Sequence, residues 1–229
     1  MKKIFYTLIV FTILFQSCIK SPYPEGYLWK GYAIGAAERD GNTSFILTDD
    51  EFALKIMIKN WDFPDSIVGV RLYAEGNIYV GKNGYDYGLE IGNCVIVPIK
   101  EAQTVENQGV IDLQNNAGIV FDKNEVFQTG KYLNVLLKYL SSKEKSKKHS
   151  FDFLINGATE RYENNTVTIN ICHNTNGDNV IEQGNQVLYS LDLTNLFDKF
   201  SSDFEIKFVY TENKQTKEVI LKIQNFNKN

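Results

Sequence analysis

The chain has 229 residues, of which 43% are hydrophobic and 13% aromatic, with 16 glycines and 4 prolines. This composition excludes a collagen-like, low-complexity or disordered chain, because it supplies enough apolar surface to offset the entropy lost on folding. The 24 basic and 28 acidic residues give a net charge of −4, which argues against a nucleic-acid partner. Because the chain has only 2 His and 3 Cys, we expect no metal and no cofactor.

Residues 1–17 have the pattern of an export signal. Two lysines follow Met1, and the apolar run from Ile4 to Phe15 is too short to cross a membrane. Ser17 then stands directly before Cys18, a junction that resembles the lipobox of bacterial lipoproteins. The resemblance implies cleavage before Cys18 and acylation of Cys18 by fatty chains such as palmitate, which hold a membrane firmly when several are present. The alternative is an ordinary signal peptide in which Cys18 is incidental.

Residues 18–28 are expected to form a tether between this anchor and the folded body. They contain Pro22, Pro24 and Gly26, which suit an extended spacer. Ile19 follows the cysteine, where an Asp would favour retention in the inner membrane of well-studied lipoprotein systems. We therefore expect the periplasmic face of the outer membrane, with the membrane contacted through the lipid.

The first part of the body, residues 29–106, is predicted to be a small barrel. Hydrophobic residues alternate with polar ones at period two in Phe52–Lys59, so that Phe52, Leu54, Ile56 and Ile58 share a face. Further strands are expected at 28–37, 44–47, 68–72 and 89–97. Turn signals stand at residues 40–42, 76–77 and 82–84. Five short strands without an intervening helix favour a barrel.

A weakly periodic polar segment, residues 98–109, is predicted to be the linker. After it, residues 107–229 show six strands, at 132–140, 151–156, 166–173, 186–193, 204–210 and 217–226. Each has one hydrophobic face, which is typical of an antiparallel sandwich. The segment from Thr194 to Phe200 is expected to form a short helix capped by Thr194. The predicted fold class is therefore all-β, with an OB-like barrel followed by a sandwich.

Four stretches of the body form a recognisable set of β motifs: Phe127–Val135, Ser150–Ile155, His173–Asp178 and Tyr189–Leu193. In these stretches the chain resembles the NigD-like lipoproteins of anaerobic Gram-negative bacteria. The resemblance implies an N-terminal OB-like barrel, a C-terminal β-sandwich and an association with bacteriocin operons, from which an immunity role has been suggested. The basic segment from Lys143 to His149 departs from the family pattern.

The histidines and cysteines offer few combinations that carry chemistry. Cys172 and His173 are neighbours on a predicted strand, so their side chains point to opposite faces and cannot form a dyad. We interpret His173 as structural and expect His149, beside two lysines, to face solvent. A disulfide between Cys94 and Cys172 is the alternative to two isolated thiols.

Two oxygen-rich segments have a structural and a chemical interpretation. Residues 174–178 resemble the opening of a calcium loop, but Asn176–Gly177 favours a hairpin turn, and Asn185 stands where such a loop needs a Glu. Residues 49–51, Asp-Asp-Glu, could supply paired carboxylates, but we expect them to face water in a turn. No nucleophile elbow, phosphate loop or zinc-hydrolase motif is present.

Aromatic residues are the feature that favours binding. Near the tether the sequence gathers Tyr23, Tyr27, Trp29 and Tyr32, and four tyrosines gather in the fourth and fifth predicted strands: Tyr73, Tyr79, Tyr85 and Tyr87. Such side chains stack on sugars or anchor protein partners, although core packing also uses them. We therefore expect a non-enzymatic envelope lipoprotein that binds a protein partner, either a bacteriocin or an envelope protein. The alternative is a glycan-binding accessory of an outer-membrane uptake system.

Overall fold

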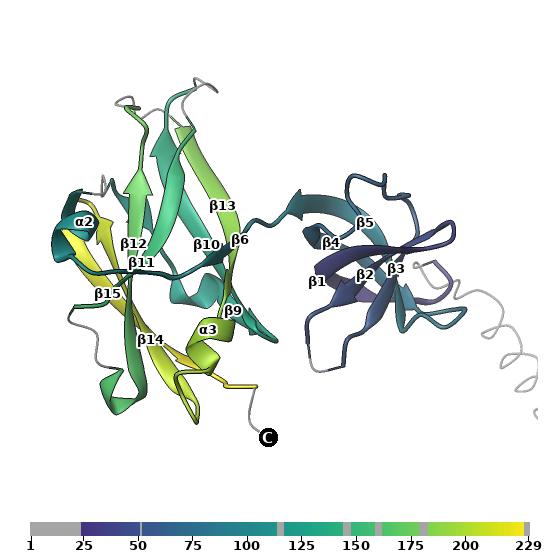
Figure 1. Cartoon of the computed structure of the whole chain (residues 1–229). Helices are drawn as coiled ribbons and strands as arrows, with labels where there is room; N and C mark the ends of the chain where they lie inside the picture. Colours follow the sequence, from purple (N-terminus) through teal and green to yellow (C-terminus); the bar gives the residue numbers. More distant parts are fainter. Residues whose placement is uncertain are drawn as a thin grey trace, which may run out of the picture.

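The computed structural model describes residues 24–50, 52–113, 117–143, 148–158, 162–178 and 183–226. In this part of the chain two β modules lie side by side (Figure 1). The predicted signal peptide, Cys18 and most of the tether lie outside the described residues. No helix in the described ranges is long and apolar enough to cross a membrane.

The first module is a five-stranded OB-like barrel. Its strands are β1 (Tyr27–Asp40), β2 (Thr43–Thr48), β3 (Lys55–Ile58), β4 (Arg71–Val80) and β5 (Tyr87–Ile96). They close in the order β1-β2-β3-β5-β4, with β3 and β5 parallel. The 14-residue β1 makes closure possible, because its first part pairs with β4 and its last six residues pair with β2.

Small side chains allow this barrel to close around a narrow core. Three alanines of β1 and β4 are buried, and the loop after β3 inserts Phe63, which is 0% exposed. The backbone amide of Phe63 donates to the buried Ser44 hydroxyl at 2.7 Å, which fixes the inserted loop. Two local predictions were wrong. Phe52 is 78% exposed because β3 begins only at Lys55, and Gly76 lies at a β-bulge inside β4 rather than in a turn.

The second module is a sandwich of two sheets. Its strands are β6 (Ile99–Glu101), β7 (Gln103–Val105), β8 (Ile119–Val120), β9 (Val126–Thr129), β10 (Tyr132–Ser141), β11 (Ser150–Asn156), β12 (Thr166–Asn174), β13 (Gln183–Asp192), β14 (Phe204–Glu212) and β15 (Gln215–Ile223). One sheet has the order β6-β13-β10, with β8 and β9 both paired to the far edge of β10, and the other has the order β15-β14-β12-β11-β7. Two 3-10 turns lie at Lys123–Glu125 and Glu163–Asn165, and two short helices are α2 (Gln108–Leu113) and α3 (Thr194–Phe197).

The segment predicted as a linker contributes to both sheets of the sandwich. β6 pairs in parallel with β13, and β7 pairs in parallel with β11. These three-residue strands carry no strong alternation, so backbone pairing and not hydrophobic pattern places them. We therefore propose that the division between the modules lies near Pro98 rather than at residues 106–107.

The inward faces predicted for the sandwich strands form its core. Together with residues from β8, α3 and the loops after them, they give a core of 22 buried residues, nine of them aromatic, including a fully buried Phe208 on β14. The predicted helix is shorter than expected, and Thr194 lies inside it rather than at its cap. The residue at the cap is Leu193, and the Oδ1 of Asp192 before it accepts from the Thr194 amide at 2.9 Å and from the Thr194 hydroxyl at 2.6 Å.

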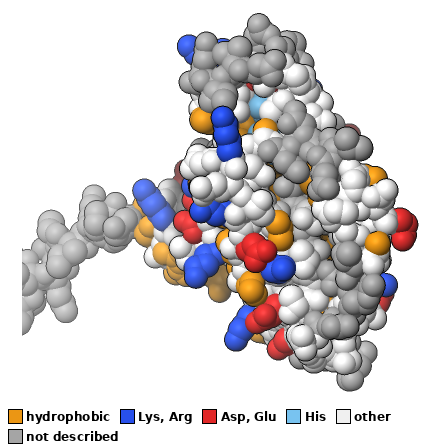
Figure 2. Space-filling model, turned by 90° about the vertical axis from the view of Figure 1, so that its left-hand side faces the viewer, with side chains coloured by type: hydrophobic (Ala, Val, Ile, Leu, Met, Phe, Trp, Pro, Cys, Tyr) orange, Lys and Arg blue, Asp and Glu red, His pale blue; other side chains and the backbone are white. Residues whose placement is uncertain are grey.

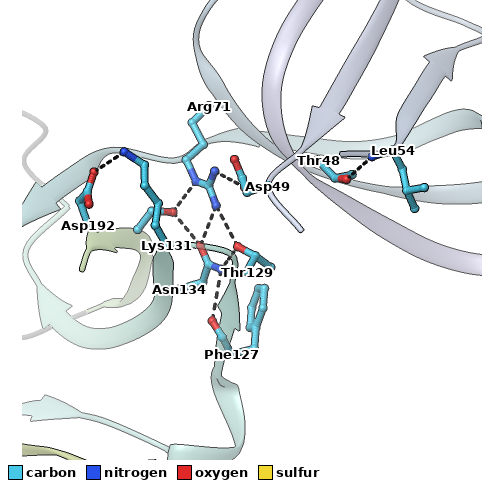
Figure 3. Close-up of polar contacts among 10 residues, drawn as sticks. Thr48, Asp49, Leu54, Arg71, Phe127, Thr129, Lys131, Asn134 and Asp192 are labelled. Atoms are coloured by element: carbon cyan, nitrogen blue, oxygen red, sulfur yellow. Dashed lines mark hydrogen bonds and ion pairs between the residues drawn. The ribbon is translucent and has the colours of Figure 1, made fainter. Parts of the chain in front are cut away.

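A buried arginine joins the two modules (Figure 3). Arg71, on barrel strand β4, is 5% exposed and forms an ion pair with Asp49. Its guanidinium also donates to sandwich residues, through Nε to Ser190 Oγ at 2.6 Å and through Nη2 to Asn134 Oδ1 at 3.2 Å. The same group lies 4.1 Å from the centre of the Tyr132 ring. One side chain therefore fixes the barrel against the β10–β13 face of the sandwich.

Candidate functional site

The barrel folds its scattered aromatic residues into cross-strand pairs. Tyr27 packs on Tyr79 with ring centroids 6.0 Å apart, and Trp29 packs on Tyr87 at 5.8 Å. Tyr32 stacks on Tyr73 at 5.4 Å. These six residues, here called the aromatic surface, come from β1, β4 and β5. Aromatic residues that the sequence separates by 40 or more positions thus meet in pairs, whereas Tyr85 packs on Phe45 instead.

Trp29 and Tyr32 remain open to solvent within this surface, with exposed fractions of 48% and 52%. A cleft of about 260 Å³ lies between them and the β2–β3 loop, and Leu54, Ile56 and Tyr87 also line it. Gly31 permits this arrangement, because a Cβ at Gly31 would lie 2.8 Å from Trp29 Nε1. An indole therefore lies against the backbone of β1 at the barrel mouth.

A second concavity on the barrel, of about 700 Å³, shares Tyr32 with the first. Three glycines line it, at positions 31, 76 and 92, and Asn60, Asn77, Asn93, Glu75, Glu90 and Lys30 supply polar groups. At Gly76 a Cβ would lie 1.9 Å from the Glu90 carbonyl oxygen, so only glycine fits the bulge. We call this concavity the polar groove.

Several polar side chains of the groove are held by bonds within the protein. Asn60 bridges to β5, where its Nδ2 donates to the Ile91 carbonyl at 2.9 Å and its Oδ1 accepts from the Ile91 amide at 2.8 Å. Tyr73 donates its hydroxyl proton to Glu75 Oε1 at 2.6 Å, and Tyr79 does the same to Glu90 Oε2. Burial and the Glu75 bond raise the pKa of Tyr73, so this proton stays in place. The groove therefore presents preorganised carboxylates and amides beside an aromatic ring.

The sandwich has a larger cleft at the end where β10, β12 and β13 meet their loops. Its volume is about 1,090 Å³, and Tyr139, His173 and Asp178 are among its lining residues. Figure 2, which faces the sandwich, shows histidine and hydrophobic side chains at this end, and acidic and basic side chains interspersed over the rest of the face. We call this concavity the tip cleft.

The prediction for His149 was wrong, and the one for His173 was incomplete. His149 has a side chain only 2% exposed, and its Nδ1 lies 2.7 Å from His173 Nε2. His173 packs on Phe151 at 4.4 Å, as expected for a structural residue, while Cys172 joins a separate cluster with Leu154 on the opposite face. No local pattern shows that the two histidines meet, because they lie 24 positions apart, His149 just before β11 and His173 on its partner strand β12.

Other predicted candidates resolve into structural roles. Asp49 does not face water, because it pairs with Arg71, and burial raises its pKa against the lowering effect of that arginine. Cys94 and Cys172 are free thiols. Asn176 and Gly177 both have positive φ, 51° and 77°, as the hairpin-turn prediction requires. Among the described residues, no group of three or more His, Cys, Asp or Glu side chains could hold a metal ion.

The two modules define an all-β protein with an OB-like barrel and a C-terminal sandwich. The family model of the NigD-like C-terminal beta sandwich domain matches residues 106–223, which is more than half of the chain. The chain therefore belongs to the NigD-like family. No curated protein matches the sequence significantly.

Solved structures share the whole two-module fold at low sequence identity. A NigD-like immunity protein from Bacteroides caccae is 17% identical with a TM-score of 0.57, covering 88% of this chain and 98% of that one. A protein of unknown function from Bacteroides vulgatus is 15% identical with a TM-score of 0.65, covering 86% and 92%. A candidate lipoprotein from Bacteroides fragilis is 9% identical with a TM-score of 0.61, covering 86% and 98%.

Proposed function

We propose that this protein is a lipid-anchored envelope protein that binds a protein partner through the aromatic surface of its barrel, in a bacteriocin-immunity-type role. The observation that carries the proposal is the half-exposed pair Trp29 and Tyr32, set around a cleft on a closed barrel. Tryptophan and tyrosine are enriched among residues that dominate protein interfaces, because they bury a large area at small entropic cost. The family membership and the solved immunity protein support the same direction.

The proposed anchor would keep this surface close to the membrane. Tyr27 begins β1 only nine positions after Cys18. A fully extended chain of that length spans about 30 Å. A partner that reaches the inner leaflet of the outer membrane, or crosses it, would therefore meet the barrel before the sandwich. The anchor itself is inferred from the sequence resemblance at Ser17–Cys18.

The binding surface can be tested by crosslinking in the native envelope. The full chain, the double variant Trp29→Ala/Tyr32→Ala and the control Ile220→Ala would be compared, since Ile220 is 55% exposed on the sandwich strand β15. We expect one protein to be enriched with the wild type and with the control, and at least tenfold less with the double variant. Equal capture by all three would place the interface elsewhere.

The immunity role has its own test. The chain is expressed in a strain that is killed by the cognate bacteriocin, with the double variant at matched envelope level. Survival with the wild type and killing with the double variant would support a role in immunity through the aromatic surface. Unchanged killing of cells that express the wild type at a confirmed level would refute the immunity role. Partner binding would still be decided by the crosslinking experiment.

The polar groove favours a second candidate, a glycan-binding accessory of an uptake system. Sugar sites combine an aromatic face with planar hydrogen-bonding groups fixed in advance, and the groove places Tyr32 beside amides and carboxylates that are already hydrogen-bonded. This arrangement fits a neutral, hydroxyl-rich ligand, because its acidic groups oppose an anionic one.

A panel of glycans can separate the two candidates. We expect a stabilising thermal shift from at least one neutral oligosaccharide with the wild type, lost in Tyr32→Ala and Asn93→Ala and retained in Ile220→Ala. Trp29→Ala should retain the shift, because Trp29 lines the cleft of about 260 Å³ beside the β2–β3 loop and not the polar groove. A flat panel at millimolar sugar would remove this candidate and leave the protein partner.

A further inference from the structure

Three titratable side chains form a buried chain beneath the tip cleft. Asp178 Oδ2 lies 3.1 Å from His149 Nε2, and His149 Nδ1 lies 2.7 Å from His173 Nε2. His173 Nδ1 ends the chain 3.3 Å from the carbonyl oxygen of Gly118. The side chains of His149 and Asp178 are 2% and 1% exposed, and His173 is 1% exposed. Both histidines of the protein are therefore in one cluster.

Counting protons along this chain gives a definite result. Each of the three contacts needs one hydrogen between its two heavy atoms. The Gly118 carbonyl only accepts, so His173 Nδ1 must carry a proton there, and His173 Nε2 is then the acceptor for His149 Nδ1–H. Two neutral imidazoles supply two protons. The third must sit between His149 Nε2 and Asp178.

We propose that this cluster is a buried binding site for one proton, occupied as an imidazolium at His149 paired with a carboxylate at Asp178, beside a neutral His173 that is protonated on Nδ1. The Ser142 backbone amide donates to the same Asp178 oxygen at 2.7 Å. A backbone N–H bond favours the charged form of a carboxylate, so the proton resides on His149. The opposite charges of the His149 and Asp178 side chains reduce the cost of burying either one.

The groups around the cluster are consistent with this assignment. From β10, the Tyr139 ring packs on both histidines at 5.0 and 5.4 Å, and burial raises the pKa of its hydroxyl, so it stays neutral. Lys138 and Lys214 line the tip cleft, and Lys138 is paired with Glu125 at 2.6 Å. Residues 144–147 and 179–182 lie outside the described residues. Burial and the neighbouring His149 lower the pKa of His173 to about 4, which agrees with a neutral second ring.

The proton site connects the elements that border the tip cleft. Asp178 holds the end of β10 through Ser142, His149 begins the approach to β11, and His173 lies near the end of β12. Loss of the third proton leaves two hydrogens for three contacts, so one of Asp178–His149, His149–His173 and His173–Gly118 would have no hydrogen between its heavy atoms. It also removes the His149 cation from beside the Asp178 carboxylate, so the loops at the tip cleft should loosen when the proton leaves.

Ring-nitrogen NMR of the full chain labelled with ¹⁵N-histidine in detergent micelles tests this directly, because only two rings contribute signals. At pH 7 we expect three protonated nitrogens and one unprotonated nitrogen, the last being His173 Nε2. The Ser142 amide should be protected from hydrogen exchange, and this protection should fall when the pH is raised until a second nitrogen loses its proton. Two unprotonated nitrogens in the folded wild type at pH 7 would overturn the proposal.

Two substitutions sharpen the result. Asp178→Asn keeps the shape of the side chain but removes its negative charge, so the third proton should be lost at pH 7 and the number of protonated ring nitrogens should fall from three to two. Asp152→Asn is the matched control, since Asp152 pairs with Lys100 at 3.5 Å on the other face of β11, and its spectrum should keep three. Three protonated nitrogens in folded Asp178→Asn would refute the pairing with Asp178. If that variant does not fold, the wild-type spectrum decides by itself.

Discussion

The barrel and the sandwich are stabilised by different means. The barrel core has ten buried residues, three of them alanine and one of them aromatic, whereas the sandwich core has 22 buried residues with nine aromatics. The barrel compensates by closure, since its sheet has no free edge. The sandwich has open edges, and it depends on the area buried between its two sheets.

The comparison indicates that the barrel is the less stable module and depends on its neighbour. Because a small core buries little surface, contacts with a neighbouring module make up a larger share of the module's free energy of folding. Arg71 supplies such contacts, because it donates from the barrel to Ser190 and Asn134 of the sandwich. Both tryptophans, Trp29 and Trp61, belong to the barrel module. Tryptophan fluorescence therefore reports barrel unfolding, while far-UV circular dichroism reports both modules.

The largest effects are expected from emptying either core. Phe208→Ala should cost about 3–5 kcal/mol of the free energy of unfolding, because it leaves a cavity in the sandwich. Phe63→Ala should cost a similar amount, but only in the barrel. Denaturant titrations should show the fluorescence transition of Phe63→Ala at a lower midpoint than the dichroism transition. Coincident transitions in Phe63→Ala would show that the modules unfold as one unit.

Arg71→Ala should cost about 3–5 kcal/mol, because it leaves Asp49 charged and half-buried without its partner. It should also separate the fluorescence and dichroism transitions. Arg39→Ala is the matched control, since Arg39 forms only an exposed pair with Asp65 at 2.7 Å, and should cost less than about 1 kcal/mol. Equal losses in the two variants would contradict the role of Arg71 in joining the modules.

Acid sensitivity should be concentrated in the sandwich. The pKa of His173 falls from its ordinary value of 6.5 to about 4 on folding. The unfolded chain therefore binds a proton that the native ring does not, and stability falls as pH drops from 6.5 to 4, by up to about 3 kcal/mol. His173→Asn should flatten this part of the profile of unfolding free energy against pH. A parallel profile in the variant would assign the acid loss to other groups.

The smallest effect is expected from an exposed ion pair of the sandwich, next to Tyr132, which contacts Arg71. Lys131 pairs with Asp192 at 3.0 Å, but its side chain is 49% exposed. Bonds from Thr194 and Lys131 outweigh the burial of Asp192 and lower the pKa of its carboxyl. Lys131→Ala should therefore cost only about 0.5 kcal/mol in a thermal melt. A loss of 2 kcal/mol or more would show that this pair stabilises the sandwich far more than an exposed ion pair ordinarily does.

The fold was largely predictable because its strands carry strong local patterns. The alternating residues of β10, β11, β12 and β14 point inward as predicted, and this is a direct effect of the two-residue period of a strand. The missed elements, β6 to β9, are two to four residues long. Segments that short have no measurable period, so pairing with a neighbour decides them. The exposure of Phe52 was mispredicted because Phe52 lies in the turn before β3, where the two-residue period of a strand does not apply.

The candidate sites were less predictable because they depend on contacts between distant positions. The sequence indicated that aromatic residues would matter, but the cross-strand register of β1, β4 and β5 decided which ones pair and which remain exposed. It could not indicate that Arg71 would enter the other module, or that His149 would be buried against His173.

Sequence alone determined the all-β class and the inward faces of the long strands, because these are properties of consecutive residues. Tertiary structure decided the joint at Arg71, the clefts around Tyr32 and the proton site at His149. Each of these arises when side chains from separate strands leave water together, and the free energy of a buried charge depends on partners that no local pattern specifies.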